Sequence, residues 1–313
     1  MIDRAAISTA RQQLGTRPDF LRTTPLMRLP GRALGVDCAE VWLKLEQTQV
    51  GGSFKARGML YRLLANPVPD SGVIIASGGN AGIAVAAAAR ALGVRCEVFV
   101  PEVSPEAKRA RLRSLGAEVV VTGAAYAQAL EACVARQKAT GALQAHAYDQ
   151  PEVVAGAGTL ALEMQEQGGR LPDSVLVSVG GGGLIGGVAA WVQSHAHVVA
   201  LEPERAPTLH AARAAGHPVD VEVGGLAADS LGARRIGSIC WDISQRHVHD
   251  ALLLPDDAIR AAQIWLWQEL KLAVEPAAAL GLAALQTGAY QPQPQETVAL
   301  ILCGANFDPA TLN

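Results

Sequence analysis

Gly51-Gly52-Ser53-Phe54-Lys55-Ala56-Arg57-Gly58 is the stretch that most constrains the fold and the chemistry of this 313-residue chain. Its lysine directly follows an aromatic residue and lies two positions before an arginine. A free lysine has a pKa of about 10.4, so it is protonated and inert at neutral pH. Desolvation and a nearby positive charge, here that of Arg57, lower this pKa and allow the amine to form Schiff bases with carbonyl compounds. The stretch therefore predicts a reactive lysine in a pocket, and the alternative is a solvated loop lysine.

Short β-branched runs alternate with alanine-rich stretches along most of the chain. This pattern is typical of parallel strands with helices on both faces of the sheet. Because 313 residues exceed the usual size of one hydrophobic core, we expect an α/β fold with two open, twisted, mostly parallel sheets. The pattern predicts strands at 73–76, 97–100, 118–121, 174–179, 198–201 and 298–302, and helices at about 81–92 and 105–115 with a further one that ends at 191.

Ligands of open α/β sheets bind beyond the carboxyl ends of the strands. Three loops rich in glycine or small residues follow expected strands, at 77–79, 180–183 and 303–306. We therefore expect these loops to meet in a cleft between two lobes, which would hold the active site.

The composition favours small-molecule chemistry. The chain is 50% hydrophobic and 18% charged, and it contains no apolar stretch as long as a membrane span. A net charge of −3 without a basic block argues against binding to nucleic acid or to a membrane surface. The N-terminal residues lack the apolar core of a secretory signal, and the five cysteines form no CxxC pair. We expect a cytoplasmic protein.

A run of four glycines separates an expected strand from an expected helix. Uncovered backbone amides at a helix N-terminus form a binding site for a phosphate dianion, and Gly180, Gly181, Gly182 and Gly183 supply them here. The same region also satisfies a dinucleotide fingerprint, with Glu202 as the acid that would bind the ribose. A nicotinamide-dependent dehydrogenase is therefore a rival interpretation, and tight packing between strand and helix is a third.

The segment Ser77-Gly78-Gly79-Asn80-Ala81-Gly82 likewise ends a strand and opens a helix. Small residues at such a point let backbone amides approach a carboxylate. Asn80 is placed to point its amide into the cleft, although asparagine is also a common helix N-cap.

Taken in order along the chain, these motifs resemble those of fold type II enzymes that depend on pyridoxal 5'-phosphate (PLP), close to the serine/threonine dehydratases, or ammonia-lyases. The resemblance covers essentially the whole chain and implies a fold like that of the tryptophan synthase β subunit. It also implies a large PLP-binding domain of residues 1–71 and 150–313 and a small domain of residues 72–149. The matching motifs are Thr24-Pro25-Leu26, Ser53 to Gly58, Ser77 to Gly82, Gly156-Ala157-Gly158-Thr159, Gly180 to Leu184, Glu202-Pro203, Glu275-Pro276 and Cys303-Gly304.

The resemblance assigns roles to individual residues. Lys55 would carry the Schiff base with PLP, Phe54 would pack on its ring, Asn80 would bind its phenolic oxygen and Cys303 would face its pyridine nitrogen. The residues that would cradle its phosphate are Gly180, Gly181, Gly182, Gly183 and Leu184. Those that would hold the substrate carboxylate are Ser77, Gly78, Gly79 and Ala81. By itself, Cys303 would be interpreted as a buried structural thiol.

Two further positions bear on ions and on the ring of the cofactor. Glu202 and Ala206 match cation ligands of the family, and Thr208 replaces an expected aspartate, so we expect a monovalent rather than a divalent ion there. The alternative for Glu202 is a carboxylate that bonds backbone amides. For Glu275, before Pro276, we favour the start of a helix over a role at the nitrogen edge of the cofactor.

The resemblance implies α,β-elimination from L-serine, L-threonine or a related 3-hydroxy amino acid, giving a 2-oxo acid and ammonia. Related racemases carry a second serine where this chain has Gly78, which disfavours racemisation and leaves space for a larger substrate side chain. The alternatives within the fold are β-replacement, threonine-synthase-like chemistry, racemisation and a catalytically silent PLP-binding protein. A homodimer is expected by analogy with the family.

Overall fold

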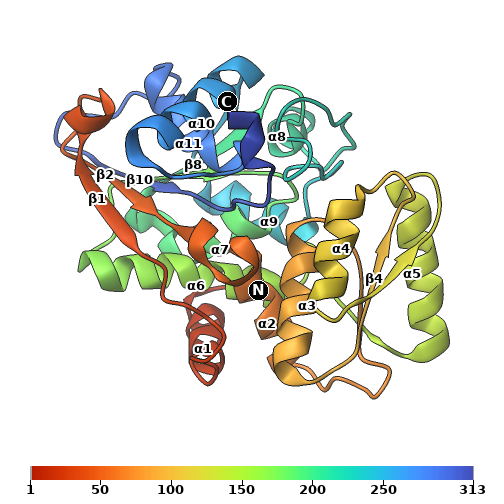
Figure 1. Cartoon of the computed structure of the whole chain (residues 1–313). Helices are drawn as coiled ribbons and strands as arrows, with labels where there is room; N and C mark the ends of the chain where they lie inside the picture. The colour runs from red at the N-terminus through yellow and green to blue at the C-terminus, as the bar shows by residue number, and fades with distance from the viewer. Residues whose placement is uncertain (1, 313) are drawn as a thin grey trace.

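The computed structural model describes residues 2–312, which form two β-sheets (Figure 1). The larger sheet has six strands in the order β1-β2-β10-β7-β8-β9. β1 pairs with β2 antiparallel, and all other neighbours are parallel. The central strands β7 and β10 are buried along their whole length, as parallel strands covered on both faces should be. The strands of this sheet are β1 (Leu26–Pro30), β2 (Glu40–Lys44), β7 (Ser174–Ser178), β8 (His197–Pro203), β9 (Asp250–Leu254) and β10 (Thr297–Ile301).

The smaller sheet has four parallel strands in the order β5-β4-β3-β6. They are β3 (Val73–Ala76), β4 (Cys96–Val100), β5 (Glu118–Val121) and β6 (Leu143–Gln144). All of them come from one continuous part of the chain. On this basis we propose the division into a small domain of residues 72–149 and a large domain of the rest.

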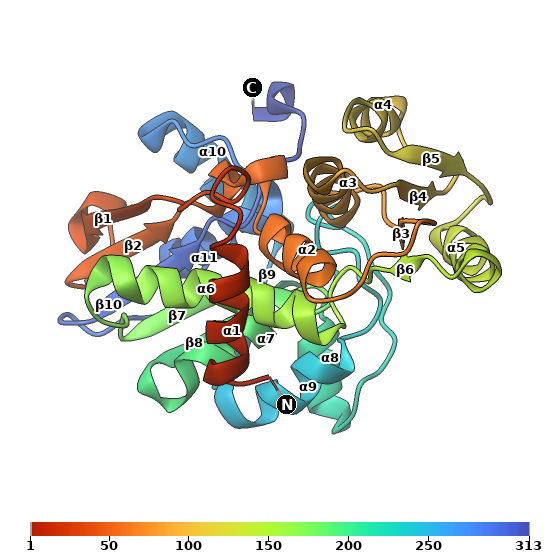
Figure 2. The same ribbon diagram turned by 90° about the horizontal axis from the view of Figure 1, so that it is seen from below.

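Helices cover both faces of the larger sheet (Figures 1 and 2). α11 packs on β7 to β10 from one side together with α10, and α6 and α7 pack together on the other side with α1 beyond them. The helices of this part are α1 (Arg4–Leu14), α2 (Lys55–Leu64), α6 (Pro151–Gly168), α7 (Gly183–Val192), α8 (Thr208–Ala215), α9 (Ser238–His247), α10 (Asp256–Leu270) and α11 (Pro276–Gln286).

The smaller sheet lies between α3 and α4 on one face and α5 on the other (Figure 2). Its helices are α3 (Asn80–Leu92), α4 (Glu106–Ser114) and α5 (Tyr126–Thr140). α3 ends at Gly93, which adopts a left-handed conformation with φ of 68°. α2 packs against both α3 and α6 and therefore joins the two parts of the molecule. The described 3-10 turns are η1 (Gly31–Leu34), η2 (Glu46–Thr48), η3 (Val50–Gly52), η4 (Gln193–His195) and η5 (Pro309–Leu312).

The α/β fold with two mostly parallel sheets confirms the sequence prediction. The strands expected at 73–76 and 118–121 have the observed bounds, and the other four agree to within two residues at each end. The sequence missed β1, β2, β6 and β9. These strands are either two residues long or contain charged residues or proline, so they lack the continuous apolar run that marked the others.

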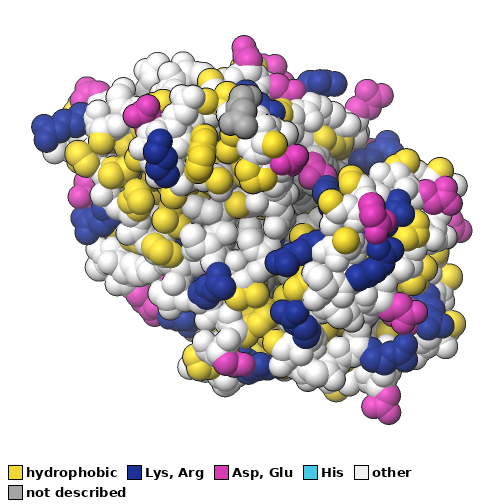
Figure 3. All heavy atoms as spheres, viewed as in Figure 1, with side chains coloured by type: hydrophobic (Ala, Val, Ile, Leu, Met, Phe, Trp, Pro, Cys, Tyr) yellow, Lys and Arg dark blue, Asp and Glu magenta, His cyan; other side chains and the backbone are white. Residues whose placement is uncertain are grey.

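Within residues 2–312, no helix is long and apolar enough to cross a membrane. The surface is hollowed between the two parts of the molecule, and lysine and arginine side chains gather on the part built by α3 to α5 (Figure 3). The loops that follow β3, β7 and β10 all supply residues that line cavities in this region.

Candidate active site

The backbone before Lys55 makes a tight turn that glycine allows. Gly51 and Gly52 have φ of 74° and 75°, in the left-handed region that other residues avoid. A Cβ at Gly52 would also lie 2.8 Å from Oδ1 of Asn306. After this turn, the amide of Phe54 donates to the carbonyl of Cys303 at 3.0 Å, and α2 begins at Lys55. The end of β10 thus fixes the start of the helix that carries the lysine.

The amine of Lys55 lies in a protein-lined pocket. Its Nζ donates to the carbonyl of Ala147 at 2.5 Å and lies 5.0 Å from the centre of the Phe54 ring. Burial lowers the pKa of Lys55 from 10.5 to about 8, and the neighbouring carboxylate of Glu275 only partly opposes that effect. A usable fraction of the amine is therefore unprotonated near neutral pH.

Arg57 does not contribute to this shift, which corrects the sequence interpretation. Its guanidinium binds the carboxylates of Glu46 and Glu163 and lines no part of the pocket. The pocket itself, and not a neighbouring cation, makes the pKa of Lys55 low.

One cavity brings together all of the residues that the sequence assigned to the cofactor. The remaining lining residues come from the end of β7, from the loop before α6, from the segment before α9 and from the start of α11. The lining residues are Phe54, Lys55, Asn80, Tyr148, Ser178, Gly180, Gly181, Gly182, Gly183, Leu184, Ser230, Leu231, Glu275, Ala277 and Cys303.

The glycine loop forms one end of the cavity. Gly182, with φ of 89°, caps the N-terminus of α7, and a Cβ there would overlap the thiol of Cys240. Among the described residues, no backbone carbonyl accepts a hydrogen bond from the amides of Gly181, Gly182 or Gly183. Free amides at a helix N-terminus carry positive potential, which suits a phosphate. The anion cradle at this loop stays a prediction, and the free amides are suited to it.

Glu275 is the acidic residue in the cavity wall, and the sequence underrated it. It directly precedes α11, as expected, but its carboxylate turns into the cavity and is 4% exposed. Asn80 Nδ2 donates to its two oxygens at 3.0 and 3.1 Å. Burial raises the pKa of Glu275 to about 7, and the hydrogen bond from Asn80 opposes this. The Glu-Pro pair marked the start of the helix but not the direction of the Glu275 side chain.

Asn80 lies at the centre of a short hydrogen-bonded chain. Its Oδ1 accepts from Asn306 Nδ2 at 2.7 Å, and the same nitrogen of Asn306 also donates to the carbonyl of Gly51 at 2.7 Å. This arrangement fixes the side chain of Asn80 from both ends. Asn306 was not singled out in the sequence, because nothing in its local pattern marks it.

Cys303 is buried at the end of β10, on the same cavity wall as Lys55 and Glu275. Burial and the adjacent Glu275 raise the pKa of this thiol well above its ordinary value. Cys303 is therefore a neutral thiol and carries no negative charge toward the cavity.

The proposed substrate loop divides between the cavity wall and the interior. Gly78 and Gly79 line a second cavity that adjoins the first and shares Asn80, Ser230 and Glu275 with it. Ser77 and Ala81 line neither of these cavities. Gly82 is required for packing, because a Cβ there would overlap the carbonyl oxygen of Ser77.

A family model described as "Pyridoxal-phosphate dependent enzyme" matches residues 18–304. The chain belongs to this family.

Individual relatives in the PLP-dependent family are similar over most of the chain. The L-threonine ammonia-lyase of Geobacter sulfurreducens is 36% identical over 280 residues, which cover 87% of this chain and 69% of that protein. The phenylserine dehydratase of Ralstonia pickettii is 36% identical over 321 residues, which cover 99% of this chain and 94% of that protein. The crystal structure of a threonine deaminase from T.th. superposes with a TM-score of 0.89 and 34% identity, covering 98% of this chain and 99% of that one.

The groups in the first cavity fit PLP. An amine with a lowered pKa suits the aldehyde, and free amides at the N-terminus of α7 suit the phosphate. The neutral thiol of Cys303 suits an unprotonated pyridine nitrogen, since it cannot hold a proton there as a carboxylate would. A dinucleotide is not required to explain the glycine loop, so the dehydrogenase alternative is set aside.

Glu202 lies at the end of β8 and is fully buried. One of its oxygens accepts from Thr208 Oγ1 at 3.0 Å and from the amide of Leu209 at 2.7 Å, and the other accepts from the amide of His210 at 2.8 Å. Thr208 Oγ1 also lies 2.5 Å from the carbonyl oxygen of Gly180, so its single proton is shared between these two acceptors. Glu202 therefore caps α8 and is linked to the glycine loop.

Proposed function

We propose that this PLP-dependent enzyme catalyses α,β-elimination from L-serine, L-threonine or a related 3-hydroxy amino acid, giving a 2-oxo acid and ammonia. The observation that carries the proposal is the position of Lys55, whose amine has a pKa of about 8 and faces a cavity closed at one end by the free amides of the glycine loop. The relatives named threonine ammonia-lyase, phenylserine dehydratase and threonine deaminase support the same reaction class.

Each residue of the cavity has a task in this proposal. PLP, when bound, supplies the electron sink that weakens the bonds at the substrate Cα. Gly180 to Gly183 and Leu184 bind its phosphate, and Asn80, oriented by Glu275 and Asn306, binds its phenolic oxygen. Phe54 packs beside it, and Cys303 faces its ring nitrogen.

Lys55 takes the proton from the substrate Cα. The carboxylate of the substrate is proposed to bind to the loop of Ser77, Gly78, Gly79 and Ala81, of which Gly78 and Gly79 line the adjoining cavity. With PLP bound, the Lys55 amine would be the general base within reach of the substrate Cα, and a pKa near neutrality suits that role. The β-hydroxyl would take up a proton and leave as water, and hydrolysis would then give the 2-oxo acid and ammonia.

Gly78 supports elimination over racemisation, because it offers no hydroxyl for proton transfer on the opposite face. A Cβ at Gly78 would lie 3.3 Å from Cγ1 of Val100, so the position is closely packed. The adjoining cavity also carries apolar side chains, among them Ile83, Leu226 and Phe307. We therefore include 3-hydroxy amino acids with substituents larger than methyl among the substrates.

The test is to measure 2-oxo acid release from a panel of L- and D-3-hydroxy amino acids that includes serine, threonine and 3-phenylserine. We expect release from L isomers. Silence across the whole panel would contradict the proposal and would favour β-replacement.

A monovalent cation at Glu202 and the carbonyl of Ala206 is part of the proposal. Glu202 is a buried carboxylate, and within residues 2–312 no lysine or arginine forms an ion pair with it, so a bound cation would balance its charge. Activity in potassium chloride should exceed that in tetramethylammonium chloride at equal ionic strength. Equal activity in the two salts would count against the ion.

The chain is also proposed to act as a homodimer in the cytoplasm, on the analogy with its family. All five cysteines are buried and free, which suits a reducing compartment. Light scattering from the purified protein gives the mass of the assembly directly.

A further inference from the structure

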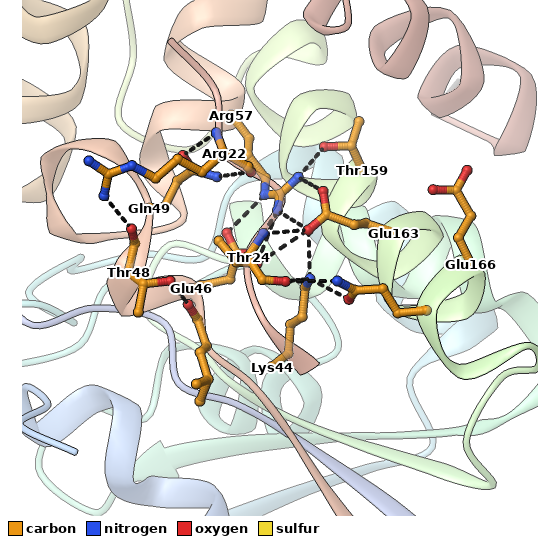
Figure 4. Close-up of polar contacts among 12 residues, drawn as sticks. Arg22, Thr24, Lys44, Glu46, Thr48, Gln49, Arg57, Thr159, Glu163 and Glu166 are labelled. Atoms are coloured by element: carbon orange, nitrogen blue, oxygen red, sulfur yellow. Dashed lines mark hydrogen bonds and ion pairs between the residues drawn. The ribbon is translucent and has the colours of Figure 1, made fainter. Parts of the chain in front are cut away.

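A second group of charged residues lies behind the first turn of α2 and lines neither cavity. We call it the anchor cluster, and it consists of Lys44, Glu46, Arg57 and Glu163 (Figure 4). All four are at most 1% exposed. Its two cations and two carboxylates balance one another in charge.

Arg57 joins the two carboxylates of the anchor cluster. Its Nε and Nη2 donate to the two oxygens of Glu46 at 2.8 and 2.7 Å. Its Nη1 and Nη2 donate to the two oxygens of Glu163 at 3.0 and 2.9 Å. A planar guanidinium held by two bidentate pairs has a single allowed orientation.

Lys44 completes the cluster from the far side. Its Nζ donates to Glu163 at 2.6 Å, to the carbonyl of Thr24 at 2.8 Å and to Gln167 Oε1 at 2.8 Å. Thr24 Oγ1 donates in turn to Glu46 at 2.5 Å. Each charged group of the cluster therefore has several partners.

The cluster connects the elements that surround Lys55. Lys44 ends β2, Glu46 begins the following turn η2, Glu163 lies in α6 and Arg57 is the third residue of α2. Lys55 is the first residue of that helix. Residues two apart in a helix point in roughly opposite directions. The side chain of Arg57 therefore leaves the first turn of α2 on the side of the anchor cluster, and that of Lys55 leaves it on the side of the cavity.

Stability alone does not account for so many buried charges. Removing four charged groups from water is costly, and well-packed apolar residues of similar size often stabilise a core equally well. Directional pairs, in contrast, fix geometry in a way that apolar contacts do not.

We propose that Arg57 is a positioning residue for Lys55: by binding Glu46 and Glu163, it sets where the first turn of α2 holds the lysine amine in the cavity. This inference rests on the proposed function only in taking Lys55 as the reacting amine.

The test compares the holoenzyme with its Arg57→Lys variant, which keeps the positive charge but loses the planar guanidinium that forms the two bidentate pairs. We expect kcat to fall about 100-fold, which is the effect of displacing a reacting group by about 1 Å, here the amine of Lys55. KM should change much less. We also expect the pH at which the visible absorbance of the cofactor on Lys55 changes to move from its wild-type value. This second readout needs no turnover, so it reports on the inference even if the proposed reaction is wrong.

Two control variants distinguish a displaced Lys55 from a general loss of stability. Gln167→Ala removes a partner of Lys44 without touching Arg57, and Arg28→Gln breaks an exposed ion pair with Glu40. Both should keep the wild-type kcat and absorbance profile, whatever their melting temperature. Should Arg57→Lys fail to fold, Glu46→Gln carries the same test, because it keeps the size of the side chain and weakens one pair. A folded Arg57→Lys or Glu46→Gln with wild-type kcat and absorbance profile would overturn the inference.

Discussion

Two groups of buried charges lie on either side of the first turn of α2, and they behave in opposite ways. In the anchor cluster each charge is paired, and pairing favours the charged forms of Arg57 and Glu163, although burial lowers the pKa of Lys44. Burial alone would raise the pKa of Glu163, but Arg57 and Lys44 overcome it and lower that pKa to about 2. In the cavity, burial dominates instead and brings the pKa of Lys55 to about 8 and that of Glu275 to about 7.

The difference shows where this chain keeps its reactivity. Pairing keeps Arg57 and Glu163 charged, whereas in the cavity Lys55 and Glu275 offset the effect of burial on each other only in part, so both can exchange protons near neutral pH. Lys44 and Lys55 differ in their partners: burial lowers the pKa of both amines, but of the two only Lys44 forms an ion pair. The following variants test this contrast.

Lys55→Ala should have the largest effect. It removes both the amine that binds the cofactor and the base that takes the α-proton, so we expect kcat to fall by about 10⁴-fold or more. Steady-state release of 2-oxo acid measures it. Lys138→Ala, at an exposed position of α5, is the matched control and should keep wild-type activity. Near-normal rates in Lys55→Ala would remove Lys55 from the reaction.

Glu163→Leu should cause the largest loss of stability. It leaves Arg57 and Lys44 in the interior with too little negative charge, and breaking a buried pair in this way costs about 3–5 kcal/mol. Urea unfolding gives the free energy. Glu40→Gln breaks an exposed pair with Arg28 and should cost no more than about 1 kcal/mol. Similar losses of unfolding free energy in the two variants would show that the buried ion pairs of the anchor cluster stabilise the fold no more than an exposed ion pair does.

Glu163 and Glu275 should give the pH dependence of stability opposite signs. Because the folded-state pKa of Glu163 is below its ordinary value of 4.5, its contribution is present above pH 4.5 and is lost as pH falls toward 2. The folded-state pKa of Glu275 is raised, so stability should fall as pH rises from 4.5 to 7. Each effect is on the order of 3 kcal/mol.

Urea unfolding of the cofactor-free protein across this pH range measures both effects. Glu275→Gln should reduce the fall in unfolding free energy between pH 4.5 and 7. Glu163→Gln should reduce the fall that occurs as pH is lowered from 4.5 toward 2. If the unfolding free energy of Glu275→Gln changes between pH 4.5 and 7 as it does in the wild type, the carboxylate of Glu275 is paired with a positive charge in the wild-type protein in solution.

Gly78→Ser should have the smallest effect. It adds a hydroxyl beside the substrate, and Val100 has to yield by a few tenths of an ångström to admit the Cβ. We expect slow racemisation to appear alongside elimination, measured as formation of D-serine from L-serine. Complete absence of the D isomer in an active variant would show that Gly78 does not determine the choice between the two reactions.

How much of this arrangement was accessible from sequence depended on the distance between partners. Lys55 and the glycine loop were predicted because each lies in a local motif whose chemistry is legible without its surroundings. Glu46 and Glu163 are 117 residues apart and are joined through Arg57 and Thr24, so no local pattern marks them. The turn of Glu275 into the cavity depends on where Asn80 and Gly304 lie, and only the folded chain brings these together.

Borohydride reduction of the holoenzyme, followed by peptide mass spectrometry, tests the contrast between the two buried lysines most directly. Reduction fixes the cofactor to whichever amine holds it. We expect the visible absorbance to bleach and the cofactor mass to appear on the peptide that contains Lys55, with none on the peptide that contains Lys44. Cofactor on Lys44 or on an exposed lysine, or a preparation that borohydride leaves unmodified, would contradict the assignment of Lys55 as the reactive amine.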